Sequence, residues 1–298
     1  MSRTPRWTTA DIADQSGRTF VVTGANAGLG LATTAALAGR GARVVMACRN
    51  LEKAEEARAS LPDSSRERTE VRRLDLSDLD SVRGFVDGTD GKVDVLVNNA
   101  GLMGIPWSRT AQGHEMQFGV NVLGHHALTL GLKPLLTDRV VWLGSLSHLW
   151  GRVDPDDLSM ERRGYRPIAA YGSSKLACLM LAYEWQRRFD RDGDGLRSVA
   201  AHPGYTATEL IRHSGRRFVD GFMALGNSIP GIGQSTEMGS LPTLFAATVR
   251  DLPGGTFVGP DGLAGLRGFP TIASSPKKSH DRSASARLWD RCTEMVRF

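Results

Sequence analysis

Short runs of β-branched and aliphatic residues alternate with longer segments rich in Ala, Leu and charged residues along this chain. Short apolar runs bounded by polar or glycine-containing stretches are typical of buried strands, and the longer segments are typical of helices. Seven candidate strands follow this pattern, at residues 20–22, 43–47, 71–74, 93–97, 140–143, 198–201 and 256–258. The alternation predicts βαβ units and an α/β fold, with a doubly wound parallel sheet of about seven strands and helices on both faces.

We expect a single domain spanning residues 1–298. Stretches that contain Gly and Pro at 226–239 and 251–265 look like loops rather than domain linkers, because the periodic segments on either side are needed to complete the sheet. The peripheral parts that we expect are an N-terminal extension at 1–17, substrate-side loops or lids at 146–170 and 209–235, and a C-terminal helix at 283–298.

The C-terminal helix is expected from apolar residues at helical spacing, which are Leu288, Trp289, Cys292, Met295 and Val296. An amphipathic helix buries its apolar face against a neighbouring surface. That surface belongs either to the same domain or to a second subunit, so the pattern leaves a homodimer and a homotetramer open as assemblies.

Composition excludes several classes of protein. The 298 residues are 41% hydrophobic, which is enough for a buried core. The 37 basic and 32 acidic residues give a net charge of +5, and the basic residues are scattered, so nucleic-acid binding is not expected. The three cysteines, Cys48, Cys178 and Cys292, lack Cys-x-x-Cys spacing and predict neither a disulfide framework nor structural zinc.

The same residues bear on the compartment. The first 17 residues are polar, and nowhere do about 18 apolar residues run together, so we expect no transmembrane segment. Few cysteines fit a reducing environment. No group of His, Cys, Asp and Glu has convincing metal-ligand spacing, so no metal is expected. We therefore predict a cytoplasmic protein.

A glycine-rich turn joins the first strand to the first helix, in the stretch Thr23-Gly24-Ala25-Asn26-Ala27-Gly28-Leu29-Gly30. Glycines there let the chain turn sharply and let a phosphate approach the backbone, while the following helix N-terminus offers free N–H groups. The spacing Gly-x-x-x-Gly-x-Gly differs from the dinucleotide fingerprint Gly-x-Gly-x-x-Gly. The strand–turn–helix setting nevertheless favours a nucleotide site over a simple tight turn.

The end of the second strand bears on the choice of coenzyme. An acidic residue about 20 positions after the glycine turn would bind the ribose 2′-hydroxyl of NAD. This chain has Cys48 and Arg49 there instead, so no carboxylate repels a 2′-phosphate and a guanidinium is present to bind it. NADP(H) is therefore preferred, with NAD(H) as the alternative, unless Arg49 is only a solvated charge at the strand end.

Tyr171 and Lys175 lie four residues apart at the head of an apolar stretch. On a helix these positions share one face, so the ammonium would lie near the phenol and favour its ionised form. A free phenol, with a pKa of about 10, is a poor acid–base catalyst near neutral pH, and a neighbouring cation improves it. The alternative for an isolated pair is chance spacing on a helix surface.

Other motifs follow in order at the predicted strand ends: Leu74-Asp75-Leu76-Ser77, Asn98-Asn99-Ala100-Gly101, Asn121 within a helix, Ser145, and His202-Pro203-Gly204. Together with the glycine turn and the Tyr/Lys pair, the sequence resembles the short-chain dehydrogenase/reductase family over nearly the whole chain. Within it, the stretches 47–50, 121–125 and 170–177 are similar to retinol-dehydrogenase-like bacterial oxidoreductases. The resemblance implies a Rossmann-type fold and a nicotinamide-dependent oxidoreductase.

The resemblance implies four catalytic residues. Tyr171 would exchange a proton with the substrate oxygen, and Lys175 would favour the ionised phenol and bind the nicotinamide ribose. Ser145 would hydrogen-bond the substrate oxygen, and Asn121 would anchor a water linking Lys175 to solvent. Taken singly, Ser145 could be a turn hydroxyl and Asn121 a helix-capping residue. One departure is Gly144, where relatives often carry a serine.

The resemblance also implies cofactor contacts along the strand ends. They are Gly24, Asn26, Gly28, Leu29 and Gly30 at the pyrophosphate, Arg49 at the 2′-phosphate, Asp75 and Leu76 at the adenine, Asn98, Ala100 and Gly101 at the adjoining ribose, and Tyr171, Lys175, Pro203, Thr206 and Thr208 at the nicotinamide end. Two of these have competing structural roles, because Asp75 could cap the helix near residues 78–86 and Thr208 could cap a helix beginning at Glu209.

The substrate is expected to be a small carbonyl compound or a primary or secondary alcohol, fairly lipophilic. Phe218 and Phe222 in the lid segment, with Trp150 in the loop before Tyr171, form either an apolar pocket or a face that packs on the core. His148 could reach substrate, although a surface or loop-bonding role is the alternative. Two other functions stay open: an activated C=C reductase, and a catalytically idle NADP-binding sensor or scaffold.

Overall fold

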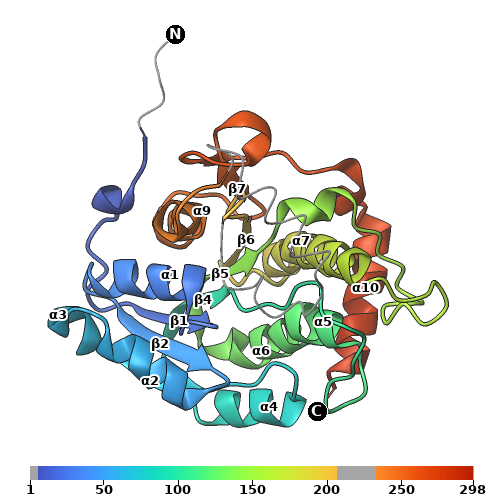
Figure 1. Cartoon of the computed structure of the whole chain (residues 1–298), viewed down its shortest axis with the longest axis horizontal. Coiled ribbons are helices and arrows are strands. Elements are labelled where there is room, and N and C mark those ends of the chain that lie inside the picture. Colours follow the sequence, from blue (N-terminus) through green and yellow to red (C-terminus); the bar gives the residue numbers. More distant parts are fainter. Residues whose placement is uncertain (1–5, 207–232, 298) are drawn as a thin grey trace.

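The predicted strands assemble into one sheet in the computed structural model, which describes residues 6–206 and 233–297 (Figure 1). The eight strands of this part of the chain are β1 Thr19–Thr23, β2 Arg43–Cys48, β3 Thr69–Arg73, β4 Val93–Asn98, β5 Leu136–Leu143, β6 Arg197–Ala201, β7 Phe257–Pro260 and β8 Pro270–Ile272. Their order across the sheet is β3-β2-β1-β4-β5-β6-β7-β8. The seven predicted strands are present, and β8 is one more than predicted.

The direction of the strands confirms the doubly wound architecture. β1 to β7 pair in parallel, and β8 pairs with β7 antiparallel. β1 lies between β2 and β4, so the winding of the chain reverses direction there. In sheets of this kind, ligands bind in the crevice beyond the carboxyl ends of the strands at such a reversal.

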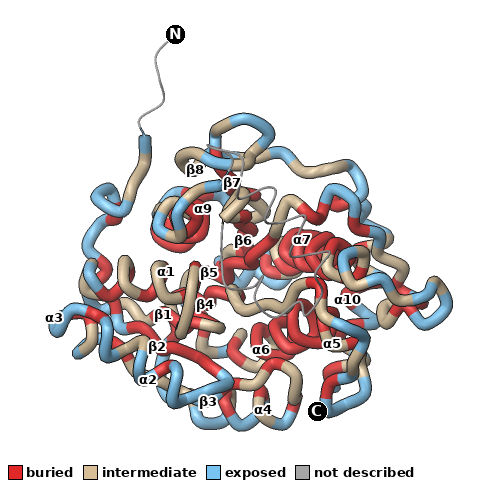
Figure 2. Tube along the Cα trace, viewed as in Figure 1, coloured by how far each residue is buried: buried red, intermediate tan, exposed pale blue. Residues whose placement is uncertain are grey.

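Helices cover both faces of the sheet, and Figure 2 shows the central strands and the inner sides of these helices as buried. The α-helices of the described residues are α1 Gly28–Ala38, α2 Leu51–Ala59, α3 Asp63–Arg66, α4 Leu79–Asp87, α5 Met116–Phe118, α6 His125–Leu132, α7 Pro167–Asp192, α9 Thr236–Thr248 and α10 Arg282–Met295. The π-helical segment is η2 Gly119–Gly124, and the 3-10 turns are η1 Thr9–Asp11, η3 Lys133–Leu135, η4 Leu146–Leu149, η6 Leu263–Gly265 and η7 Lys277–His280.

Two hydrophobic cores follow from the alternation of side chains along the strands. Phe20 and Val22 of β1 face a core shared with α1 and α9, whereas Val21 faces a core shared with α4, α6, α7 and α10. The strands are therefore buried on both faces, which explains why their sequences are nearly continuous apolar runs. The described helices contain none that is long and apolar enough to cross a membrane.

The two ends of the described chain pack on the domain. In the predicted N-terminal extension, Ile12 is buried and the Trp7 ring meets the Phe245 ring of α9 edge-on at 5.3 Å. At the other end, Trp289 of α10 meets Trp185 of α7 at 4.5 Å. The apolar face of the C-terminal helix is therefore buried against its own chain. The helix ends at Met295, and α9 begins at Thr236, inside a stretch predicted to be loop.

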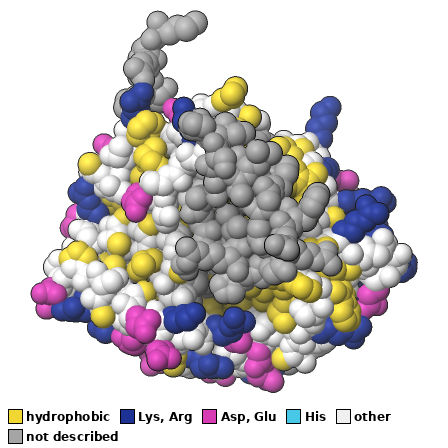
Figure 3. All heavy atoms as spheres, viewed as in Figure 1, with side chains coloured by type: hydrophobic (Ala, Val, Ile, Leu, Met, Phe, Trp, Pro, Cys, Tyr) yellow, Lys and Arg dark blue, Asp and Glu magenta, His cyan; other side chains and the backbone are white. Residues whose placement is uncertain are grey.

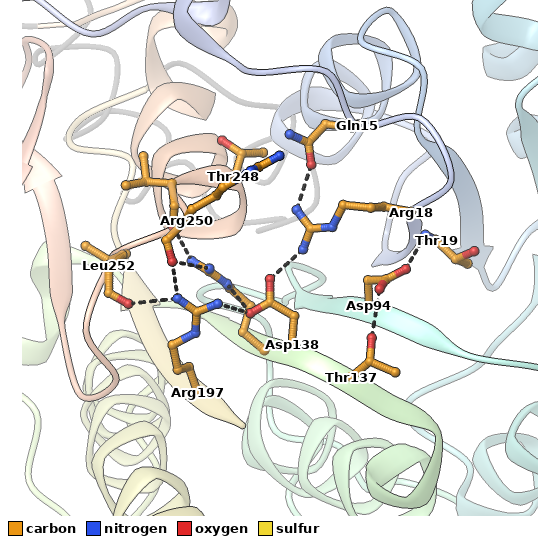
Figure 4. A network of polar contacts seen from close by, with 12 residues as sticks. Gln15, Arg18, Thr19, Asp94, Thr137, Asp138, Arg197, Thr248, Arg250 and Leu252 are labelled. Atoms are coloured by element: carbon orange, nitrogen blue, oxygen red, sulfur yellow. Dashed lines mark hydrogen bonds and ion pairs between the residues drawn. The ribbon is translucent and has the colours of Figure 1, made fainter. Parts of the chain in front are cut away.

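A network of charged groups connects the strands at their amino ends, opposite the end of the sheet that carries the glycine turn (Figure 4). The Asp138 carboxylate pairs with Arg18 at 2.5 Å, with Arg139 at 3.1 Å and with Arg197. The Arg139 side chain is 1% exposed and donates to the Val249 carbonyl at 2.8 Å, at the end of α9. One carboxylate thus joins β1, β5, β6 and α9.

The face drawn in Figure 3 carries charges of both signs over the described residues. Lys and Arg side chains alternate with Asp and Glu on this face and form no continuous basic patch among the described residues there.

Candidate functional site

The glycine turn between β1 and α1 has the geometry of a phosphate cradle. Gly24 and Gly28 have φ of +64° and +50°, which glycine adopts without strain. A Cβ at Gly30 would lie 2.2 Å from the Gly24 carbonyl oxygen and 2.6 Å from Asn99 Nδ2, so only glycine fits. Ala27 precedes α1 and offers no side-chain cap, which leaves the first N–H groups of the helix for an anion.

A cleft of about 260 Å³ extends from this turn across the carboxyl ends of the first four strands. The predicted pyrophosphate, adenine and ribose contacts that line it are Gly24, Asn26, Gly28, Leu29, Gly30, Arg49, Asp75, Leu76, Ala100 and Gly101. The cleft therefore lies where the reversal of the sheet predicts a ligand, and its residues fit a dinucleotide.

Arg49 and Asp75 have different surroundings in this cleft. Among the described residues, the exposed Arg49 guanidinium makes no hydrogen bond or ion pair, and only its carbonyl accepts from Arg73 at 3.4 Å. The Asp75 carboxylate accepts from the backbone and hydroxyl of Ser77 at 3.0 and 2.6 Å. The residue that caps α4 is Asp78, so the alternative role considered for Asp75 is wrong.

Two neighbouring asparagines point in different directions at the end of β4. The Asn98 side chain is buried and donates to Thr129 Oγ1 at 3.0 Å, so it does not line the cleft. Asn99 does line it, and its side chain donates to the Thr23 carbonyl at 2.7 Å. The predicted ribose contact of the Asn98 side chain is therefore wrong, and Asn99 is a lining residue that the sequence motif does not single out. Side chains alternate between the two faces along a strand, and that alternation was the available signal.

A second cavity of about 120 Å³ adjoins the cleft and contains three of the four predicted catalytic residues. The predicted site residues that line it are Leu29, Gly101, Ser145, Tyr171, Lys175, Pro203 and Thr206. Leu29, Asn99, Gly101 and Leu143 line both cavities. One groove therefore runs from the glycine turn to the hydroxyl-bearing side chains.

Tyr171 and Lys175 lie on one face of α7, as their spacing predicts. Lys175 Nζ is 5.9 Å from the centre of the Tyr171 ring. The Lys175 side chain is buried, and its ammonium donates to the Leu143 carbonyl at 2.8 Å, at the end of β5. This bond ties the ammonium to the sheet and holds it beside the phenol.

Asn121 lies in η2, a segment of π-helix, which often marks a functional position. Its side chain accepts from the Leu102 N–H at 2.8 Å and donates to the Leu102 carbonyl at 3.0 Å and to Ser174 Oγ at 2.9 Å. A Cβ at Gly101 would lie 3.2 Å from Asn121 Oδ1 and 3.5 Å from Lys175 Nζ. Gly101 thus leaves the space between these two groups open.

Ser145 follows β5, caps a helical turn and lines the second cavity. Its hydroxyl lines the second cavity and also accepts from the Ser147 N–H at 3.3 Å, capping η4. His148 is buried, with its Nδ1 2.6 Å from the Ser145 carbonyl, and burial lowers its pKa. It does not line the cavity, so the loop-bonding alternative describes it.

The expected substrate-side segments are only partly described. Thr206 donates to the Pro203 carbonyl at 3.1 Å. Thr208 and most of the predicted lid, residues 209–232, lie outside the described residues. The 146–170 segment is held by Tyr165, which donates to the Ile105 carbonyl at 3.0 Å. Its last four residues belong to α7. In the described ranges, no group of His, Cys, Asp and Glu is arranged to hold a metal ion.

A phosphate cradle at the reversal point of a doubly wound sheet defines a nucleotide-binding α/β protein. The family model described as short chain dehydrogenase matches residues 18–141. Retinol dehydrogenase 13 from Homo sapiens is 36% identical over 289 residues, covering 94% of this chain and 85% of that protein.

Two further relatives extend this likeness. Polyprenol dehydrogenase from Mus musculus is 38% identical over 258 residues, covering 80% of this chain and 74% of that protein. The crystal structure of an uncharacterized protein from Mycobacterium paratuberculosis is 41% identical with a TM-score of 0.83, covering 98% of this chain and 97% of that one. The chain belongs to the short-chain dehydrogenase/reductase family and is an oxidoreductase that uses a nicotinamide cofactor.

Proposed function

We propose that this protein is an NADP(H)-dependent enzyme that interconverts a carbonyl group and an alcohol on a lipophilic small molecule. The observation that carries the proposal is the continuous groove from the glycine turn to Ser145, Tyr171 and Lys175. A dinucleotide bound in the cleft would bring its nicotinamide end to the hydroxyl-bearing cavity. The three free and buried cysteines support a reducing, cytoplasmic setting.

The protein's own residues would handle the proton and hold the substrate, while the bound nicotinamide supplies or accepts the hydride. The Tyr171 hydroxyl donates a proton to the carbonyl oxygen in reduction and removes it from the alcohol in oxidation. The Lys175 ammonium, 5.9 Å from the phenol ring, stabilises the negative charge that the phenol acquires. Ser145 donates a hydrogen bond to the same substrate oxygen and orients it.

Asn121 would connect the ammonium to solvent. Its Oδ1 accepts one hydrogen bond, from the Leu102 N–H, and a carbonyl oxygen has two lone pairs. Oδ1 and Lys175 Nζ both border the space beside Gly101, where a Cβ would lie 3.2 Å from the first and 3.5 Å from the second. A water bound there would link the Lys175 ammonium to solvent. The role of Asn121 would then be to hold this water rather than to touch the substrate.

Arg49 supports the preference for NADP(H). A charge-assisted hydrogen bond contributes about 1.5–3 kcal/mol, so loss of the guanidinium should raise the KM for NADPH by about 10- to 150-fold. We expect Arg49→Ala to do this and to leave the KM for NADH nearly unchanged. Arg43→Ala is the matched control, because Arg43 lies at the other end of β2 and pairs with Glu70. A wild-type enzyme that prefers NADH would refute this coenzyme assignment.

The names of the relatives and the lining of the second cavity support a lipophilic substrate. Retinol and polyprenol are long isoprenoid alcohols, and relatives named for both match most of this chain. Met103, Leu143 and Tyr205 line the cavity beside Tyr171. Burial of each additional methylene contributes about 0.8 kcal/mol, so kcat/KM should rise about fourfold per carbon along a series of linear aldehydes. A preference for short polar aldehydes would contradict this.

A further inference from the structure

His125 begins α6, four residues after Asn121, and both of its ring nitrogens have partners. The residue is 1% exposed. Its Nδ1 lies 3.1 Å from the Asn121 carbonyl oxygen, and its Nε2 lies 2.9 Å from Thr23 Oγ1. Thr23 ends β1, so this one side chain joins the strand before the glycine turn to the π-helical segment that carries Asn121.

The partners determine which nitrogen carries the proton. A carbonyl oxygen only accepts, so Nδ1 is protonated and donates to Asn121. Burial lowers the pKa of His125 to about 3, so the ring is neutral at physiological pH. Nε2 must then accept, and the donor is the Thr23 hydroxyl. His125 is therefore held as the Nδ1–H tautomer.

The Thr23 hydroxyl is fully used by this arrangement. Its single proton goes to His125 Nε2 at 2.9 Å rather than to the Val97 carbonyl, which lies farther away at 3.4 Å. Its oxygen accepts from the N–H groups of Asn99 and Ala100, both at 2.9 Å, and the Asn99 N–H is shared with the Val97 carbonyl. A hydroxyl has one proton and two lone pairs, so this is a complete set. Asn99 and Ala100 line the cofactor cleft. The orientation of the Thr23 hydroxyl, and with it the backbone of the turn after β4, thus depends on His125.

The other end of the imidazole acts on Asn121. Its carbonyl accepts from His125 and also from Cys178 Sγ at 3.2 Å, while its side chain bonds both backbone groups of Leu102. Leu102 follows directly after the cofactor turn. Asn121 is therefore fixed by both its backbone and its side chain. Its side chain bonds Leu102 directly, and its carbonyl is connected through His125 and Thr23 to Asn99 and Ala100.

We infer that His125 is a positioning residue of the reaction, which as a neutral donor and acceptor sets the spacing between the cofactor turn and Asn121. It lines neither cavity, and in the described part of the chain its ring bonds Thr23 and Asn121. This role rests on the proposed function. Its consequence is that the two ends of the ring govern different kinetic constants: the Thr23 end governs coenzyme binding, and the Asn121 end governs turnover.

Two substitutions separate the ends. The amide of an asparagine reaches the position of Nδ1, so His125→Asn keeps a donor for Asn121 and loses the acceptor for Thr23. The amide of a glutamine reaches the position of Nε2, so His125→Gln does the reverse. We expect His125→Asn to raise the KM for NADPH about tenfold with kcat within about twofold of wild type, and His125→Gln to lower kcat about tenfold with little change in that KM.

The next residue supplies a matched control. His126 is also buried, and its pKa is likewise lowered to about 3, but its Nε2 lies 3.0 Å from Thr293 Oγ1 and its ring meets Trp289 of α10. His126→Asn and His126→Gln carry the same chemical changes one position along, away from the groove. They should lower the thermal stability by a similar amount and leave kcat and the KM for NADPH within about twofold of wild type.

Two measurements test the inference independently of turnover. Nitrogen-15 NMR of the histidine rings should show His125 as the Nδ1–H tautomer across pH 5 to 8. Amide hydrogen exchange at Asn99 and Ala100 should be slow in wild type and faster in His125→Asn, but not in His126→Asn. A wild-type enzyme that turns over no carbonyl compound with either coenzyme would refute the proposed function, whatever these two measurements show.

The inference about His125 is overturned if wild type is active and both His125 variants match the corresponding His126 variants in kcat and in the KM for NADPH. If the His125 variants do not fold, the hydrogen bond between His125 and Thr23 can be removed at Thr23 instead. Thr23→Val removes the hydroxyl and should raise the KM for NADPH about tenfold, and Thr23→Ser should restore it. Equal constants for these two variants would also overturn the inference.

Discussion

Gly30 gives the sharpest test of the phosphate cradle, because an added methyl group has no room there. A Cβ at this position would lie 2.2 Å from the Gly24 carbonyl oxygen, whereas carbon and oxygen normally approach to about 3.3 Å. Gly30→Ala therefore requires a shift of about 1 Å. The nearest atoms belong to the Gly24 backbone and to Asn99 Nδ2, and Asn99 is itself bonded to the Thr23 carbonyl.

The expected loss of stability is the balance of two costs and one gain. Overpacking of this size costs about 1–3 kcal/mol, and disturbing the hydrogen bonds of Asn99 adds about 1 kcal/mol or more. Replacing glycine by alanine inside a helix stabilises the folded state by about 1 kcal/mol. The net loss is about 1–3 kcal/mol. For a chain of this length, that lowers Tm by about 2–6 °C.

The cofactor should respond more strongly than the fold. Moving the Gly24 carbonyl closes the space that the cradle offers a phosphate, so the Kd for NADPH should rise at least about tenfold, which corresponds to about 1.4 kcal/mol. Thermal unfolding with and without NADPH measures both quantities in one experiment. The Tm increase that saturating NADPH gives in wild type should shrink in the variant.

Gly84 supplies the control for this prediction. It lies inside α4, and a Cβ there meets nothing within 4 Å. Gly84→Ala should stabilise the protein by about 0.5–1 kcal/mol and leave the Kd for NADPH unchanged. The steric reasoning is refuted if Gly30→Ala behaves like Gly84→Ala in both Tm and Kd.

Two further predictions concern stability. Asp138→Asn should lower the free energy of unfolding, measured in urea, by about 2–3 kcal/mol, because it leaves three guanidinium groups without their carboxylate. Asp63→Asn, in an exposed ion pair, is the control and should cost less than about 0.5 kcal/mol. Equal losses for the two variants would contradict this. Burial lowers the pKa of His125 and His126 to about 3 and of His202 to about 4, below the value of about 6.5 in an unfolded chain. Below pH 6.5 the unfolded state therefore binds more protons than the folded state. The free energy of unfolding should fall by about 3–4 kcal/mol as the pH is lowered from 6 to 5. A urea midpoint that stays constant from pH 7 to 5 would contradict this.

Most of the sheet could be predicted because parallel strands buried on both faces are nearly continuous apolar runs. β8 could not be, since its three residues begin with Pro270 and end with Ile272, which is 66% exposed. Such an edge strand carries no contrast between apolar and polar positions. The packing of the N-terminal extension could not be predicted either, because Trp7 contacts Phe245, which is distant in the sequence.

The site residues could be predicted where a known rule applies, namely that ligands of a doubly wound sheet bind beyond the carboxyl ends of its strands. Gly30 and Arg49 line the cleft for this reason. Asn98 and Asn99 show the limit of the rule, because adjacent positions face opposite sides and the motif alone does not say which one faces the ligand. The link from Thr23 to His125 spans 102 positions, and only the packing of β1 against α6 brings the two together.

Replacement of Tyr171 by phenylalanine tests the proposed chemistry most directly. General acid catalysis contributes about 10²- to 10⁴-fold, so Tyr171→Phe should lower NADPH-dependent aldehyde reduction by at least about 100-fold while the Kd for NADPH stays within about twofold. Tyr183→Phe removes a hydroxyl from the same helix, where it contacts Ser275, and should leave turnover unchanged. Turnover by Tyr171→Phe within about threefold of wild type would contradict the assignment of Tyr171 as the proton donor.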